Sequence, residues 1–127
     1  MDTPSNKGLT MITGMKNIVI FVRDFERAKR FYQEQLKLPL IQESMAMMEF
    51  FPGGGTTLGV ASALHDDALK LVGRHTGVTL TVKGIEQVCR DLTAAGVAFA
   101  EPLEVSPWGK MAVVKDPDGN QLALVEL

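Results

Sequence analysis

The sequence repeats itself once, and this repeat limits the folds that the chain can adopt. Residues 19–32, VIFVRDFERAKRFY, align with residues 79–92, TLTVKGIEQVCRDL, so that Glu26 coincides with Glu86. PGGGTTLGV likewise aligns with PDGNQLALV near the C-terminus after a one-residue slip in the turn. One such unit cannot bury both faces of a small sheet. We therefore expect two units packed side by side, with their helices outside.

Each repeat has the pattern of a strand, a helix and further strands. Alternating or β-branched runs predict strands, whereas apolar residues three to four positions apart predict helices. The first repeat gives strand 17–22, helix 25–36 after an Asp24 N-cap, strand 43–51, turn 52–55 and strand 56–62. The second gives strand 77–82, helix 85–96, extended segment 97–105, strand 110–115, turn 116–119 and strand 120–126. The expected fold class is therefore α+β.

The length and composition fit a single domain. The chain has 127 residues, and the apolar share of 46% is large enough for a real core. Residues 1–14 are polar and lack periodicity, so we expect a disordered leader or an extension foreign to the native chain. Residues 15–127 form the expected domain. Its two modules span 15–62 and 77–127, and the crossover 63–76 connects them.

Charge and cysteine content exclude several classes of partner. The net charge is −2 and no basic run occurs, which argues against a nucleic-acid partner. No apolar stretch approaches the ~20 residues of a membrane span, so we expect no membrane partner. The single cysteine, Cys89, cannot form an intrachain disulfide, and this fits a cytoplasmic location.

Two motifs carry a resemblance to a known family. The helix motif VRDFERAKRFY and the DPDGN turn before the last strand resemble those of the vicinal oxygen chelate superfamily. This group contains glyoxalases, extradiol dioxygenases and bleomycin-resistance proteins, and the resemblance covers residues 16–127. It implies two βαβββ modules that form a curved mixed sheet, with helices outside and a cup inside. Because this fold supports several activities, the resemblance alone assigns no chemistry.

The resemblance also identifies where a metal site would lie. Metal-dependent relatives carry one ligand on each of four strands, and the motifs place these positions on Asn17, Gly59, Gly77 and Ala123. Glycine and alanine have no donor atom, and an asparagine amide is not a usual ligand of a transition metal. We therefore expect neither a metal nor a cofactor.

A displaced metal site has two candidate ligands. His75 shares a strand face with the position of Gly77, and Glu49 lies in a methionine-rich strand whose two faces are both apolar. The sequence does not show which face of that strand lines the cup. If His75 and Glu49 held a metal, the chain would be a lyase or isomerase of the glyoxalase type.

A cup without a metal would be lined mostly by apolar side chains with a few hydroxyls and amides, which is typical of small-molecule pockets. The expected ligand-binding residues are Asn17, Phe21, Thr57, Gly59, Thr79, Trp108, Gln121 and Ala123. The sequence thus favours a metal-free protein that binds a small, mostly apolar molecule. A cationic ligand such as bleomycin would need Glu49 to face inward. A metal-free enzyme using Asn17, Gln121 or a hydroxyl is a third interpretation.

The expected oligomer is a homodimer. Relatives in the superfamily commonly pair, often by exchanging halves between chains. The apolar stretch 45–51 of the predicted strand would be hard to leave uncovered in a monomer. The crossover 63–76 is long enough for an exchange of halves.

Overall fold

The computed structural model describes residues 11–127 and confirms the predicted fold class. Module 1 consists of β1 (Asn17–Val22), α1 (Phe25–Lys29), η2 (Arg30–Gln35), β2 (Leu40–Glu43), β3 (Met47–Phe50) and β4 (Thr57–Ser62). A short helix, α2 (Asp66–Leu69), lies in the crossover. Module 2 consists of β5 (His75–Thr81), α3 (Ile85–Ala94), β6 (Ala98–Ser106), β7 (Gly109–Lys115) and β8 (Gln121–Glu126). None of the helices in the described part of the chain is long and apolar enough to cross a membrane.

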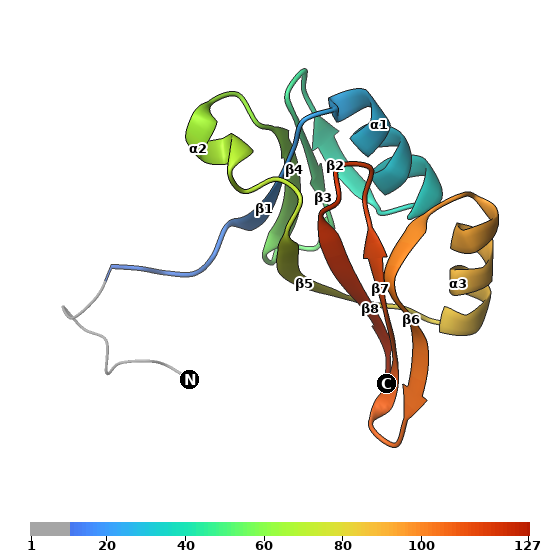
Figure 1. Ribbon diagram of the computed structural model, residues 1–127. Helices are drawn as coiled ribbons and strands as arrows, with labels where there is room; N and C mark the ends of the chain where they lie inside the picture. The colour runs from blue at the N-terminus through green and yellow to red at the C-terminus, as the bar shows by residue number, and fades with distance from the viewer. Residues whose placement is uncertain (1–10) are drawn as a thin grey trace.

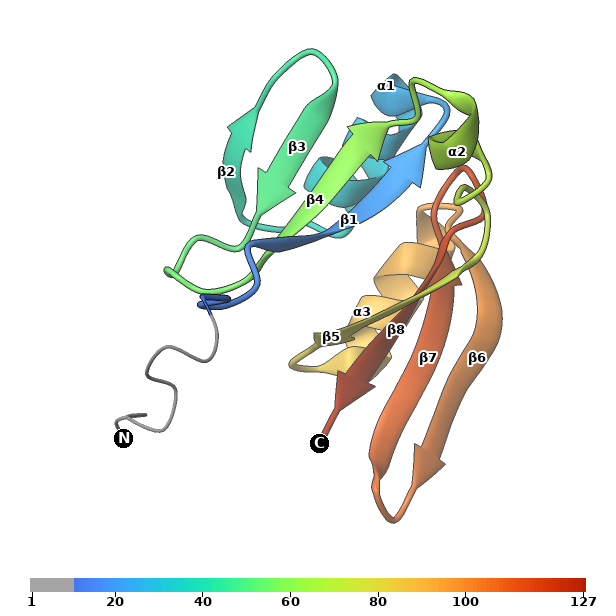
Figure 2. The ribbon, with the colours of Figure 1, turned by 90° about the vertical axis from the view of Figure 1, so that its left-hand side faces the viewer.

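Each module builds its own four-stranded mixed sheet. The strand orders are β1-β4-β3-β2 and β5-β8-β7-β6, so the two repeats have the same topology. The edge strands β1 and β5 do not hydrogen-bond to each other, and the molecule therefore has two sheets and not one continuous curved sheet. Figure 1 shows α1 and α3 on the same side of both sheets. Figure 2 shows the opposite side with the two sheets side by side. This side is here called the helix-free face because neither α1 nor α3 covers it, although the short helix α2 lies at its edge.

Several elements differ from the sequence prediction. The predicted strand 43–51 is shortened to β3, because the chain turns at 44–46, where the Ser44 N–H donates to the Met47 carbonyl. Strand β2 lies before this turn and was not predicted apart from Glu43. Strand β5 begins two residues earlier than predicted, at His75. The predicted helix 25–36 changes after Lys29 into a π-helical turn, in which the Leu36 N–H donates to the Phe31 carbonyl at 2.8 Å.

The first strand shows how the faces are divided. Ile20 and Val22 are buried beneath the helices, together with Met48 and Phe50 of β3. The core is continuous across the two modules and includes Leu124 of β8. This division matches the strand alternation that the sequence predicts.

Side chains cap both main helices. The Asp24 carboxylate accepts the Arg27 N–H at 3.1 Å, which confirms the predicted N-cap of α1. Helix α3 follows Gly84 and is capped from a distance. The Glu126 carboxylate on β8 accepts the N–H groups of Gly84 and Ile85, both at 2.9 Å. These bonds hold the pKa of the Glu126 carboxyl below its usual value.

The DPDGN turn, residues 116–120, connects module 2 to the end of β1 in module 1. The Asp118 carboxylate accepts the N–H groups of Arg23 at 3.1 Å and Asp24 at 3.3 Å. The fully buried Asn120 donates its amide to the Phe21 carbonyl at 3.0 Å. Because these partners are backbone groups, the bonds fix the position of β1 relative to the turn.

A buried side-chain pair strengthens this connection. The Tyr32 hydroxyl, on η2, donates to the Asp116 carboxylate at 2.8 Å, and the Asn120 amide donates to the same oxygen at 2.9 Å. Burial raises the pKa of the Asp116 carboxyl despite these donors. Burial, followed by the Asp116 charge, also raises the pKa of the Tyr32 hydroxyl well above its usual value, so Tyr32 stays protonated and donates.

The substitution Tyr32→Phe is expected to lower the free energy of unfolding by about 1–3 kcal/mol, because it leaves a buried carboxylate oxygen short of one donor. Urea denaturation measures this change. The matched control is Gln35→Ala, which removes an exposed bond between the modules, from the Gln35 amide to the Ala95 carbonyl at 3.3 Å. The control should change stability by less than about 0.5 kcal/mol. Equal effects of the two substitutions would contradict the importance of the buried pair.

Candidate functional site

The four positions at which relatives hold a metal lie on the strands that the sequence predicted. Asn17 begins β1 beside Thr57, and Gly59 lies on β4. Gly77 lies on β5, and Ala123 lies on β8 opposite Thr79. Only Asn17 carries a donor atom. Within residues 11–127, no three His, Cys, Asp or Glu side chains lie close enough together to hold a metal ion. This donor set does not fit a transition metal.

The backbone at Gly77 is a second reason why the four expected positions do not fit a transition metal. Gly77 has φ +79°, a left-handed conformation that residues with a side chain rarely adopt. The pairing of β5 with β8 shifts register between His75 and Thr79, so the irregularity coincides with the expected ligand position. A histidine there would be strained, which the sequence alone did not indicate.

At Gly59 a neighbouring side chain fills the space. A Cβ built on Gly59 would lie 2.7 Å from Met47 Cε and 3.3 Å from Val19 Cγ2. Met47 therefore lies over the position at which the resemblance would place a metal ligand. Its flexible thioether packs well in such an irregular gap.

Glu49, one of the two candidate ligands of a displaced metal site, lies on the helix-free face, where β3 pairs it with Gly59 of β4. Glu49 is 5% exposed, and its carboxylate accepts bonds from the Gln42 amide at 2.8 Å, from the Lys16 ammonium at 3.3 Å and from the Thr57 hydroxyl. The Thr57 bond, followed by the Gln42 bond, holds the pKa of the Glu49 carboxyl below its usual value. The carboxylate is thus ionised and held in place.

His75, the other candidate ligand of a displaced metal site, is exposed at the start of β5. Its Nδ1 accepts the Gly77 N–H at 3.1 Å, so this nitrogen already has a partner. His75 lines a cavity of about 300 Å³ together with Val19 and Phe21 of β1. That cavity does not include Glu49.

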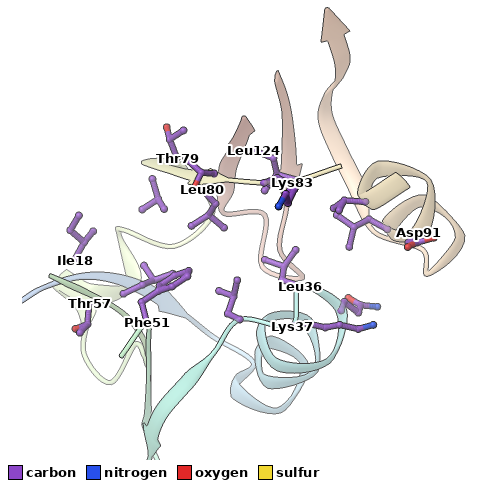
Figure 3. A pocket seen from close by; sticks show the side chains of 18 of the residues that line it. Ile18, Leu36, Lys37, Phe51, Thr57, Thr79, Leu80, Lys83, Asp91 and Leu124 are labelled. Carbon is purple, nitrogen blue, oxygen red and sulfur yellow. The ribbon is translucent and has the colours of Figure 1, made fainter. Parts of the chain in front are cut away.

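A large cavity of about 770 Å³ lies between the two modules (Figure 3). This volume falls within the usual range for small-molecule pockets. Six of its apolar side chains, three from each module, are Leu36, Phe51, Leu58, Val78, Leu80 and Leu124. Thr57, Thr79 and Thr81 add hydroxyls, and Lys37, Lys83 and Asp91 add charges. The cavity opens where β1 begins and β5 ends, the region in which the sheets diverge in Figure 2.

Two residues of the cavity wall have unusual backbone conformations. Phe51 has φ +75° and Lys37 has φ +57°, and both residues line the cavity. A positive φ is costly for a bulky residue and persists only where the surroundings enforce it. The Phe51 N–H donates to the Pro39 carbonyl at 2.8 Å and so helps to hold this conformation. In Figure 3 the Phe51 ring points into the cavity.

The structure does not bring the eight predicted ligand-binding residues to one cavity. Thr57 and Thr79 line the large cavity, whereas Phe21 lines the smaller one beside His75. Trp108 is 85% exposed in the turn between β6 and β7. The others are Asn17, Gly59, Gln121 and Ala123, which lie on β1, β4 and β8 and do not line the large cavity.

Sequence reasoning missed the residues that connect the regular elements of module 1 at this cavity. Leu36 and Leu38 follow η2, and Phe51 follows β3. The sequence placed Leu36 at the end of helix 25–36 and Phe51 at the end of strand 43–51, whereas the structure ends both elements one residue earlier. Periodicity assigns faces only within regular elements, so it did not indicate that these residues and Leu38 line a cavity.

The comparisons with known proteins now identify the family. The model of the Glyoxalase/Bleomycin resistance protein/Dioxygenase superfamily matches residues 14–124. The chain belongs to this superfamily. The resemblance that the two motifs indicated is thereby confirmed. No curated protein matches the chain significantly.

Solved structures of the glyoxalase superfamily fold are similar over most of the chain. A member of this superfamily from Sphaerobacter thermophilus DSM 20745 is 31% identical, with TM-score 0.74, and the match covers 93% of this chain and 100% of that one. TnmS3, an antibiotic-binding protein from Streptomyces sp. CB03234, is 26% identical, with TM-score 0.68 and coverages of 92% and 98%. A lactoylglutathione lyase from Agrobacterium tumefaciens is 14% identical, with TM-score 0.66 and coverages of 91% and 94%, and shares the fold alone.

The substitution Gly77→Ala tests the backbone argument. It is expected to lower the free energy of unfolding by about 1–2 kcal/mol, because an L-residue is strained in the left-handed conformation. Gly55→Ala is the matched control, since Gly55 has ordinary φ and open space around it. Thermal or urea unfolding gives both values. A Gly77→Ala variant as stable as the control would show that position 77 accepts a side chain.

Proposed function

We propose that this superfamily member binds a small, mostly apolar molecule in the cavity between its two modules, without a metal. The observation that carries this proposal is the 770 Å³ cavity with apolar side chains from both modules. The similarity to TnmS3, described as an antibiotic-binding protein, supports a binding role.

We propose a cytoplasmic location because Cys89 is a free, buried thiol.

The cavity favours an apolar ligand for a physical reason. Its opening leaves core-facing residues in contact with water, and Ile18 of β1, for example, is 43% exposed. Covering apolar surface contributes about 25 cal/mol per Å². A flat or elongated apolar molecule between Phe51 and Leu80 would bury surface on both modules at once.

The alternative of a metal-dependent lyase lacks a fitting donor set. Glu49 already accepts bonds from three side chains, and His75 Nδ1 accepts a backbone N–H. We therefore derive no catalytic step through a metal. The proposed role is binding.

Blocking the cavity tests this proposal. Ile18 lines the cavity and its side chain is 43% exposed, so Ile18→Trp places bulk at the cavity without replacing a buried core residue. With 2-naphthol as the probe, we expect this variant to bind at least tenfold more weakly than the original chain, as measured by calorimetry. The control Val105→Trp, at a 67% exposed position of β6 outside the cavity, should bind within twofold of it.

A chelator provides the second arm of this experiment. Because the proposed binding uses no metal, EDTA should leave the 2-naphthol affinity unchanged. Unchanged binding by Ile18→Trp would remove the cavity from the proposal. Loss of binding with EDTA, restored by a divalent cation, would favour the lyase interpretation.

We also propose that the protein forms a homodimer through the region of β2. This edge strand is exposed along its whole length, with Leu40 41% and Ile41 40% exposed, and Met45 in the next turn is 96% exposed. An apolar edge strand left open to water promotes association. An exchange of halves would keep the bonds of the DPDGN turn but make them between chains.

Light scattering during size-exclusion chromatography tests the dimer. The mass should be about twice the 13.8 kDa of one chain. Ile41→Asp should shift the equilibrium toward the monomer, because it places a charge on the apolar edge. Val105→Asp, an exposed apolar position on β6, is the control and should leave the dimer intact. A monomer at all concentrations would contradict the proposal.

A further inference from the structure

Glu49 is a buried carboxylate that the proposed function does not use. It does not line the cavity between the modules, although its hydrogen-bond partner Thr57 does. Its side chain is only 7% exposed, and it lies on the helix-free face among Met47 and Gly59. A buried carboxylate is costly unless it is paired, so its partners decide what the site can bind.

The cation that pairs with Glu49 is poorly held. The Lys16 ammonium lies 3.3 Å from the carboxylate, but the Lys16 side chain is 77% exposed. It reaches Glu49 from the segment that precedes β1. An ion pair with a solvated, flexible lysine contributes little, because water and salt compete for the ammonium group. Lys16 is therefore a displaceable partner, whereas Gln42 and Thr57 lie on the sheet strands that flank β3.

A small cavity of about 160 Å³ adjoins the carboxylate. It is lined by Gln42, Glu43, Ser44, Met47 and Glu49. Since one water molecule takes about 30 Å³ of liquid volume, the cavity has room for about five. An ammonium, amidinium or guanidinium group fits this space.

The second carboxylate of the cavity is already engaged. Glu43 pairs with the Lys29 ammonium at 2.7 Å and accepts the Gln33 amide at 3.0 Å. Lys29 is less exposed than Lys16, with 37% of its side chain accessible. Glu49 is thus the carboxylate whose cation can be replaced. The flexible Met47 side chain supplies an apolar wall for the body of a ligand.

We propose that Glu49 is a binding site for the cationic group of a small organic cation, and that the Lys16 ammonium occupies this site when the ligand is absent. An amidinium or guanidinium donates two parallel N–H bonds to a carboxylate, a stronger arrangement than one lysine contact. The ligand therefore replaces Lys16 on a carboxylate that is already desolvated and oriented. This site is separate from the cavity between the modules and does not rest on the proposed function.

Benzamidine is the probe, and calorimetry at low ionic strength is the measurement. The original chain should bind benzamidine, and Glu49→Gln should weaken the binding at least tenfold. Lys16→Ala should strengthen it severalfold, because it removes the internal competitor. Glu101→Gln is the matched control, since Glu101 is an exposed carboxylate on β6, and it should leave the affinity unchanged.

The neutral analogue benzamide separates charge recognition from apolar contact. Benzamide should bind at least tenfold more weakly than benzamidine to the original chain. Equal binding of the two compounds, full benzamidine binding by Glu49→Gln, or weaker binding by Lys16→Ala would each overturn the proposal. The Lys16→Ala result holds even if Glu49→Gln folds poorly. The proposed binding of 2-naphthol does not involve Glu49, so the Glu49→Gln variant should bind 2-naphthol as the original chain does. This measurement separates a failure of the Glu49 site from a failure of the proposed cavity.

Discussion

The hydrogen bonds between the DPDGN turn and the end of β1 hold the two modules together at one end. Asp118 and Asn120 bond to the backbone at residues 21, 23 and 24, and Asp116 bonds to Tyr32 within the shared core. No strand pairing joins the two sheets. The sheets diverge away from the turn, and the large cavity, which includes Ile18, opens between them. The same connection that unites the modules thus determines where the cavity lies.

The fold has kept the superfamily topology while the expected metal positions have changed in several ways. Ala123 lacks a donor atom, Met47 covers Gly59, and Gly77 adopts a left-handed conformation that strains an ordinary side chain. Restoring single ligands would therefore not rebuild the site, because the pairing of β5 with β8 is irregular at Gly77. What remains in the described residues is an apolar cavity between the modules and a carboxylate, Glu49, on the helix-free face.

Local signals predicted the fold, whereas the site depends on contacts that local signals do not encode. The Asp24 cap and the DPDGN turn are local patterns, the repeat is a match between two such sets of patterns, and each was confirmed. The direction of Glu49 was not predictable, because the methionines on both faces of its strand remove the usual alternation. The cavity was missed because Phe51 owes its orientation to a positive φ, which depends on tertiary packing.

A crystal structure with 6-bromo-2-naphthol tests the central claim most directly, because the anomalous signal of bromine locates the ligand without bias. The account predicts one bromine site between Phe51 and Leu80, and no divalent metal near Asn17 and Ala123. Bromine bound only over the helix-free face, or a metal ion coordinated beside Asn17, would contradict it.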